Sequence, residues 1–220
     1  INNKFVGSFG DIGVWSFCQD KIISTSGEGG MIATNNTKLF KKIWSLKDQG
    51  RNIDKMHKSK DNKFRYVHDY LGLNFRMTEI QAKIGAIQLS KLRSWVKKRN
   101  FNAKLILNFL QNYPEIFEDI EFRKNYSHAF YRLCVPLKLS RKRINKFLSD
   151  CHSKGLKISS GPCPEIYKEN TFKKFFGKKF YLNNANYLSG RTITFLVDQT
   201  ITKKKMMIFL KKLKFIISRL

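Results

Sequence analysis

Ser16 and Lys21 are the residues of this chain whose types and spacing suggest chemistry. They stand five positions apart, just after a short apolar run, and a glycine-rich turn follows at residues 27–30. Ile22 and Ile23 come directly after the lysine. A lysine amine that is partly desolvated has a lowered pKa and can attack a carbonyl carbon. The alternative is an ordinary surface lysine in a hairpin, and the spacing alone favours that alternative.

The order of residues around Lys21 resembles the active-site signature of the DegT/DnrJ/EryC1/StrS family of pyridoxal-phosphate (PLP) sugar aminotransferases. The matching residues are Gly10-Asp11, Gly13, Ser16-Phe17, Lys21 and Gly27-Glu28-Gly29-Gly30-Met31. The resemblance implies that Lys21 holds the cofactor covalently and, once freed by substrate, moves a proton between the substrate carbon and C4′ of the cofactor. It also implies that Ser16 binds the cofactor phosphate. Residues 18–20 depart from the types often found there, at positions that vary in the family.

A second block, at residues 68–82, is similar to the family's G-x-N-Y-R-M-T-E-x-Q-A segment, with Phe75 in place of tyrosine. The resemblance implies that Asn74 reaches the PLP phosphate of a neighbouring subunit, so that a homodimer shares its active sites. An amide just before a helix suits a phosphate. The structural alternative makes Asn74 a turn residue and Thr78 a helix N-cap. Arg76 is a candidate substrate contact or, equally, a salt bridge at the start of that helix.

Two weaker matches lie further along the chain, at residues 160–167 and 195–202. They resemble stretches of the family's small domain. Asp198 and Gln199 depart from the histidine and proline that are frequent at those positions. By the resemblance Glu165 and Tyr167 are candidates to face a sugar nucleotide, while ordinary packing and solvation explain both residues as well.

Hydrophobic periodicity and turn residues predict the elements that carry these blocks. Two short strands at 14–17 and 31–34 form a hairpin-like pair, a helix covers 37–47, and 49–70 is an exposed loop. A long helix begins at Thr78 and runs toward residue 112. Strands at 129–136, 156–159 and 191–197 then alternate with helices capped by Ser140 and Thr202.

These elements, together with the resemblance, predict an α/β fold of the PLP-dependent transferase fold type I, which is aspartate aminotransferase-like. Residues 1–76 are expected to form the C-terminal part of a PLP-binding large domain, residues 77–113 a connecting helix, and residues 114–220 a small α+β domain. In the family, the aspartate that binds the pyridinium nitrogen and the groups that cradle the phosphate precede the point where this chain begins. We therefore expect the chain alone to be an inactive fragment.

The charge of the chain is extreme, at +27 with an isoelectric point near 10.1. Lysine and arginine are spread over the whole length, which fits a compositional bias better than a nucleic-acid footprint. A positive field would in either case attract anionic substrates. The four cysteines form no C-x-x-C pair and have no histidine at zinc-ligand spacing, so we expect reduced thiols in a cytoplasmic protein and no metal site. No signal peptide opens the given sequence, which as a fragment can have lost one, and the sequence contains no membrane-length apolar run.

The reaction implied by the resemblance is a transamination. An amino acid, expected to be glutamate, would give its amino group to a keto-sugar linked to a nucleotide diphosphate, for polysaccharide or other amino-sugar biosynthesis. One rival is a PLP sugar dehydratase, but those relatives carry histidine where this chain has Lys21. A rival from another class is a non-catalytic basic module that binds nucleic acid, although the aromatic residues look like core positions rather than stacking platforms.

Overall fold

The computed structural model describes residues 1–56, 66–120, 125–162, 165–176 and 180–220. The chain divides into two compact units, unit 1 (Ile1–Leu92) and unit 2 (Arg93–Leu220). Helix α3 (Glu79–Leu110) contributes residues to both units. Within the described residues, no helix is both long enough and apolar enough to cross a membrane.

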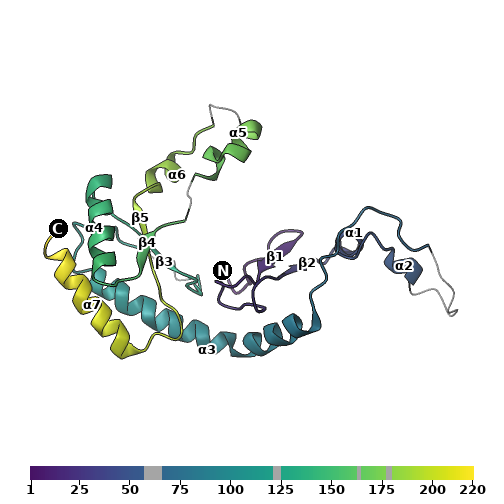
Figure 1. Ribbon diagram of the computed structural model, residues 1–220, viewed down its shortest axis with the longest axis horizontal. Coiled ribbons are helices and arrows are strands. Elements are labelled where there is room, and N and C mark those ends of the chain that lie inside the picture. The colour runs from purple at the N-terminus through teal and green to yellow at the C-terminus, as the bar shows by residue number, and fades with distance from the viewer. Residues whose placement is uncertain (57–65, 121–124, 163–164, 177–179) are drawn as a thin grey trace. The chain divides into compact units, whose positions relative to one another are not determined.

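Unit 1 contains a two-stranded antiparallel ribbon of β1 (Gly13–Ser16) and β2 (Gly30–Ala33), seen in Figure 1. The hairpin-like pair predicted from the sequence is confirmed, with each strand beginning and ending one residue earlier. Large apolar side chains stay exposed on both strands; they include those of Val14 and Ile32. The ribbon therefore has little core of its own.

Two helices follow the ribbon in unit 1. Helix α1 (Thr37–Lys47) has the predicted bounds and is capped by Asn36, whose side chain accepts hydrogen bonds from two backbone N–H groups of the first turn. The segment expected to be an exposed loop contains a short helix, α2 (Ile53–Met56), which starts where the Asn52 side chain accepts from the Asp54 amide at 3.0 Å. That local cap is the reason the loop prediction was wrong there, and residues 57–65 lie outside the described part.

Unit 2 is built on a three-stranded antiparallel sheet. The strands are β3 (Leu133–Pro136), β4 (Ile158–Ser160) and β5 (Thr192–Phe195), in the order β3-β5-β4. All three were predicted, but each is shorter than expected. For the first strand the reason is Phe130, whose φ of +49° breaks the extended conformation.

Ser140 and Thr202 cap the N-termini of helices α4 (Arg141–Ser153) and α7 (Lys203–Ile217), as predicted, because each side chain accepts a hydrogen bond from the backbone N–H three residues on. A 3₁₀ turn, η1 (Ile166–Lys168), and two short helices, α5 (Asn170–Phe176) and α6 (Asn183–Leu188), were not predicted. These three elements connect β4 to β5.

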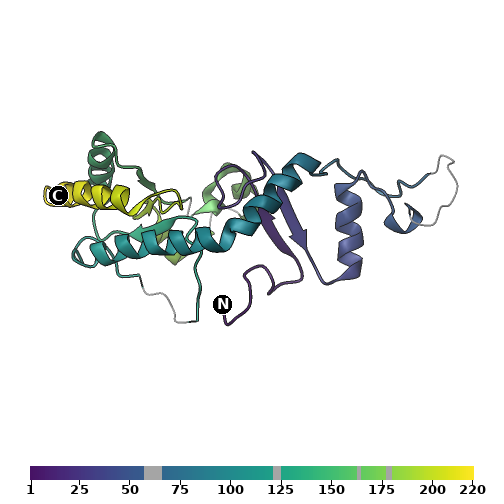
Figure 2. The ribbon, with the colours of Figure 1, turned by 90° about the horizontal axis from the view of Figure 1, so that it is seen from below.

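The core of unit 2 lies on one face of the sheet, beside which Figures 1 and 2 show α4, α7 and the C-terminal part of α3. Alternate strand residues point into it, as the pleat requires. Its fully buried members include Leu133, Ile193, Phe195, Phe147, Ile106 and Leu213. Every buried hydrophobic side chain among the described residues belongs to unit 2.

Candidate functional site

The loop between β1 and β2 carries Lys21 and is held by its own backbone. Phe17 N donates to Gly29 O at 2.8 Å, and Thr25 N donates to Phe17 O at 3.1 Å. Thr25 is buried, and its hydroxyl donates to Glu28 O at 3.0 Å. A Cβ on Gly29 would collide with the Thr25 hydroxyl, so only glycine fits there. The turn that follows Lys21 is thus folded back onto the strand that precedes it.

The Lys21 ammonium is paired with a neighbour. Its Nζ lies 3.1 Å from Asp20 Oδ1, and 34% of the lysine side chain is exposed. The Cys18 thiol donates to the same carboxylate oxygen at 2.9 Å. The sequence suggested that Ile22 and Ile23 partly desolvate this amine. In the structure both isoleucines are half-buried, and Lys21 has a carboxylate partner and partial access to solvent.

Ser16 ends β1, close in the chain to the lysine. Its Oγ accepts a hydrogen bond from Cys18 N at 3.4 Å, and Cys18 O accepts from Lys21 N at 3.1 Å. The two candidate residues therefore flank Cys18 on one loop, between β1 and β2, whose internal hydrogen bonds hold it together; we call it the tied loop. A hydroxyl that accepts one hydrogen bond still has its own hydrogen to donate.

Helix α3 holds this loop with two glutamine side chains. Gln81 Nε2 donates to Glu28 O at 3.0 Å, and Gln88 Oε1 accepts from Ser24 N at 2.9 Å. The two glutamines lie seven residues apart, which places them on the same side of the helix. No such role was predicted for these two residues from the sequence, because a glutamine on a helix is normally solvated.

Asn74 and Arg76 lie in a second cluster of unit 1, around the buried carboxylate of Asp48. Arg76 NH1 is 3.3 Å from Asp48 Oδ1, and Arg76 Nε donates to Asn74 Oδ1 at 3.0 Å. An isolated bridge pairs Asp48 with Asn74. Arg76 thus forms the salt bridge that was one of its two expected roles. The Asn74 side chain is exposed, and its amide nitrogen has no hydrogen-bond partner in the described part of the chain.

Glu165 and Tyr167 lie in unit 2 and bond to each other. Glu165 Oε1 accepts from Tyr167 Oη at 2.7 Å and from Asn186 Nδ2 at 3.2 Å, and it pairs with Lys168 Nζ at 2.8 Å. The hydrogen bond from Lys168, followed by that from Tyr167, lowers the pKa of Glu165 to about 2. Both candidate substrate residues are buried. Their contacts join η1 to α6.

Asp198 and Gln199, which depart from the family pattern, bind a buried arginine of α3. Arg99 NH1 lies 3.0 Å from Asp198 Oδ2 and also donates to Gln199 Oε1, while Arg99 Nε donates to Phe130 O at 2.8 Å. Burial lowers the pKa of Arg99, and the charge of Asp198 opposes that shift. Asp198 and Gln199, which follow β5, therefore have a structural role as acceptors that hold Arg99 of α3.

Comparison with known proteins gives a consistent set of relatives. The profile of the DegT/DnrJ/EryC1/StrS aminotransferase family matches residues 1–213. The GDP-perosamine synthase of Vibrio cholerae is 37% identical over 114 residues, which are 52% of this chain and 28% of that protein. An uncharacterized protein of Methanocaldococcus jannaschii is 29% identical over 98% of this chain and 56% of its own length.

Solved structures agree with the sequence relatives. The aminotransferase from Psychrobacter cryohalolentis is 31% identical, with a TM-score of 0.89, and the match covers 98% of this chain and 58% of that one. The PLP-dependent transferase fold type I predicted from the sequence is confirmed. This chain spans about half the length, or less, of the curated relatives that it matches.

Proposed function

Because the chain belongs to the DegT/DnrJ/EryC1/StrS aminotransferase family, we propose that the protein transfers an amino group from an amino acid to a nucleotide-linked keto-sugar, with PLP as its cofactor. The observation that carries this proposal is the tied loop that presents Lys21 and Ser16 together, held on α3 by Gln81 and Gln88. A primary amine and a hydroxyl are the groups that a cofactor with an aldehyde and a phosphate requires.

The residues present fit PLP by their chemistry. Lys21 offers an accessible amine, Ser16 a hydroxyl hydrogen, and Asn74 an amide nitrogen with no partner among the described residues. Lys21 would hold the cofactor, and Ser16 would bind its phosphate. Asn74 would bind the phosphate in a second copy of the protein, which makes the proposed assembly a homodimer.

In the proposed reaction, PLP supplies an electron-poor ring that stabilises negative charge on a substrate carbon. The neutral Lys21 amine would take a proton from that carbon through Nζ and return it to the neighbouring atom. Its ion pair with Asp20 must break first, because only the neutral amine has a lone pair. Glu165 and Tyr167, which are buried and bonded to each other, would hold η1 and α6 in place rather than contact the substrate.

The proposed substrate is a keto-sugar carried on a nucleoside diphosphate, with glutamate as amino donor, for polysaccharide or other amino-sugar synthesis. The support is the family together with a GDP-sugar enzyme among its named relatives. The net charge of +27 would raise the local concentration of such an anion. Cys18, Cys134 and Cys151 are free thiols, which fits a reducing compartment, and we place the protein in the cytoplasm.

Reductive labelling tests the proposal directly. The protein is incubated with PLP, reduced with borohydride, digested and analysed by mass spectrometry, and glutamate-dependent amination of nucleotide-linked keto-sugars is assayed in parallel. We expect the label at Lys21, its loss in Lys21→Arg, and its retention in Lys38→Arg, an exposed lysine of α1. Labels scattered evenly over the 32 lysines would overturn the proposal.

A further inference from the structure

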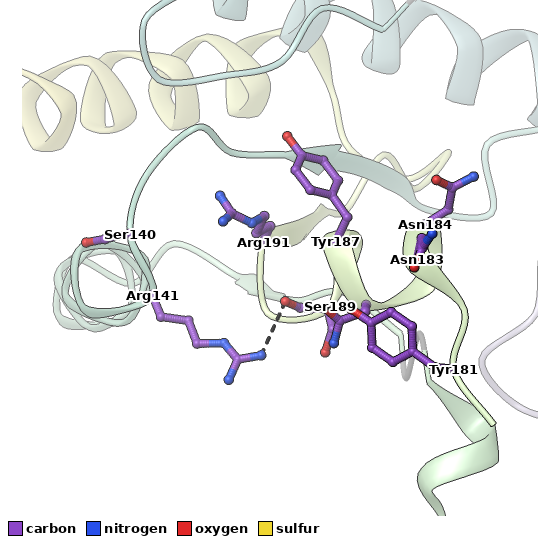
Figure 3. Close-up of a pocket in the computed structure, with 9 residues that line it drawn as sticks. Ser140, Arg141, Tyr181, Asn183, Asn184, Tyr187, Ser189 and Arg191 are labelled. Carbon is purple, nitrogen blue, oxygen red and sulfur yellow. Dashed lines mark hydrogen bonds between the residues drawn. The ribbon is translucent and has the colours of Figure 1, made fainter. Parts of the chain in front are cut away.

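Unit 2 contains a cavity of about 770 Å³ between the start of α4 and the segment from α6 to β5 (Figure 3). Among the described residues, its basic lining residues are Arg141 and Arg191, and no lysine or carboxylate of that part of the chain lines it. Lysine outnumbers arginine by 32 to 11 in the chain, so a random sample of its basic surface would be mostly lysine. Two arginines together in this lining therefore differ from what a merely solvated basic surface of this chain would show.

Most N–H donors of the two guanidinium groups have no acceptor among the described residues. Arg141 extends from α4 toward Ser189, whose carbonyl accepts from Arg141 NH2 at a long 3.4 Å (Figure 3). The Arg191 guanidinium lies 5.1 Å from the centre of the Tyr187 ring. In the described residues neither arginine pairs with a carboxylate. A Cβ on Gly190 would stand 2.7 Å from Arg141 Nε, so the glycine permits this close approach.

The beginning of α4 adds positive charge where a helix disfavours it. Its first turn holds Arg141, Lys142 and Arg143 and no acidic residue. Cations at a helix N-terminus oppose the helix dipole, whereas an anion there is stabilised. A bound anion would satisfy both the helix end and the arginine side chains.

The aromatic walls of the cavity are held in place by hydrogen bonds. Tyr181 Oη donates to Asn186 Oδ1 at 2.8 Å, and Asn186 Nδ2 donates to Glu165 at 3.2 Å. Tyr187 Oη donates to Glu118 Oε1 at 2.6 Å. About half of each tyrosine residue is exposed, at 57% for Tyr181 and 51% for Tyr187. Two fixed rings therefore offer flat apolar surface beside the arginines.

We propose that this cavity is a binding site for a phosphate-bearing ligand of the nucleotide class. The planar fork of arginine matches phosphate oxygens in pairs, and a tyrosine ring offers a face on which a base can stack. A cavity of this size lies within the range of roughly 300–1,000 Å³ typical of small-molecule sites. The site needs neither PLP nor amino transfer, so it can be tested without them.

Calorimetric titration of the protein without PLP tests this site at about 0.15 M salt, where distant charges are screened. The probes are uridine diphosphate, inorganic phosphate and uridine. We expect saturable binding in that order of decreasing affinity. Arg141→Ala and Arg191→Ala should each weaken diphosphate binding about tenfold or more, because each removes hydrogen bonds to a charged group. Arg141→Lys should weaken it nearly as much, because lysine keeps the charge and loses the fork.

The matched control is Arg219→Ala, an exposed arginine on Phe215 whose loss changes the net charge equally. It should leave binding within about twofold, and equal thermal unfolding curves should show that all variants fold. Equal weakening by Arg219→Ala, uridine binding as tight as the diphosphate, or no saturable diphosphate binding would each overturn the site. Phosphate binding equal to diphosphate binding would overturn the nucleotide class.

Discussion

Lys21 and Asp20 form an ion pair at 3.1 Å that the proposed attachment of the cofactor to Lys21 would have to break. The side chains of Lys21 and Asp20 are 34% and 43% exposed. Ion pairs this exposed contribute about 0.2–1 kcal/mol to stability. Asp20→Asn removes this cost. We therefore predict that Asp20→Asn raises the fraction of protein labelled at Lys21 at low PLP concentration by up to about fivefold, measured by borohydride reduction and mass spectrometry.

The control for that prediction is Asp54→Asn, which breaks another exposed pair, Lys41 with Asp54 at 2.7 Å. It changes the net charge by the same amount and lies away from the Lys21 loop in the sequence. A similar gain in Asp54→Asn would mean that the general field, and not the partner of Lys21, sets the reactivity.

Glu165 links the stability of unit 2 to acid pH. Its folded pKa is about 2 against an ordinary value of 4.5, because Lys168 and Tyr167 bond the charged form. A depressed folded pKa gives stability that is complete above pH 4.5 and is lost as pH falls toward 2. We predict that Glu165→Gln lowers the melting temperature above pH 5, and that its difference from wild type shrinks as pH falls toward 3.

Glu115→Gln serves as the matched variant, since Glu115 is exposed and outside this network. Wild type and Glu115→Gln should melt alike at every pH, as followed by circular dichroism. A constant difference between Glu165→Gln and wild type from pH 6 to pH 3 would contradict the assigned cause of the shift.

At the scale of elements, α3 positions the Lys21 loop through Gln81 and Gln88. Each hydrogen bond contributes about 0.5–1.5 kcal/mol, so removing one should open the loop several times more often. We predict that Gln88→Ala speeds amide exchange of residues 17–29 about fivefold, by hydrogen-exchange mass spectrometry. Gln111→Ala, at an exposed turn just beyond α3, should leave that exchange unchanged. If amide exchange of residues 17–29 were unchanged in Gln88→Ala, the Gln88 contact from α3 would not position Lys21.

Elements with local signals were predicted well from the sequence. Ser140 and Thr202 were recognised as N-caps because a capping side chain bonds within its own turn. The strands were placed less well, because a ladder depends on a partner far along the chain. Helix α6 was missed because its asparagine-rich turn has no apolar stripe. Its link to the core is a tertiary contact, that of Asn186 with Glu165.

The candidate site shows the same division between local and distant information. The proximity of Ser16 to Lys21 follows from chain order. The surroundings of Lys21 did not follow, because the exposure of a side chain depends on everything that packs around it. The contact from Gln88 to the loop spans 64 residues, and no local pattern signals such a contact.

At the scale of the whole molecule, the two units differ in what holds them together. All buried hydrophobic side chains among the described residues lie in unit 2, whereas unit 1 buries polar residues such as Thr25 and Asp48. Unit 1 also exposes Val14 at 69% and Ile32 at 49%. A short two-stranded ribbon without a packed face is marginally stable in water. Unit 1 should therefore open at a lower free energy than unit 2.

We predict that hydrogen exchange resolves two classes of amides, with β1 and β2 exchanging orders of magnitude faster than β3 and β5. Leu213→Ala should destabilise unit 2 by about 2–5 kcal/mol, because it leaves a cavity in a closed core, and should hardly change exchange in β1. Val14→Ala, at an exposed position, should change neither unit by more than about 0.5 kcal/mol. Protection of β1 equal to that of β5, or a large effect of Val14→Ala, would mean that the apolar ribbon is covered in solution, as it would be by a second copy of the protein.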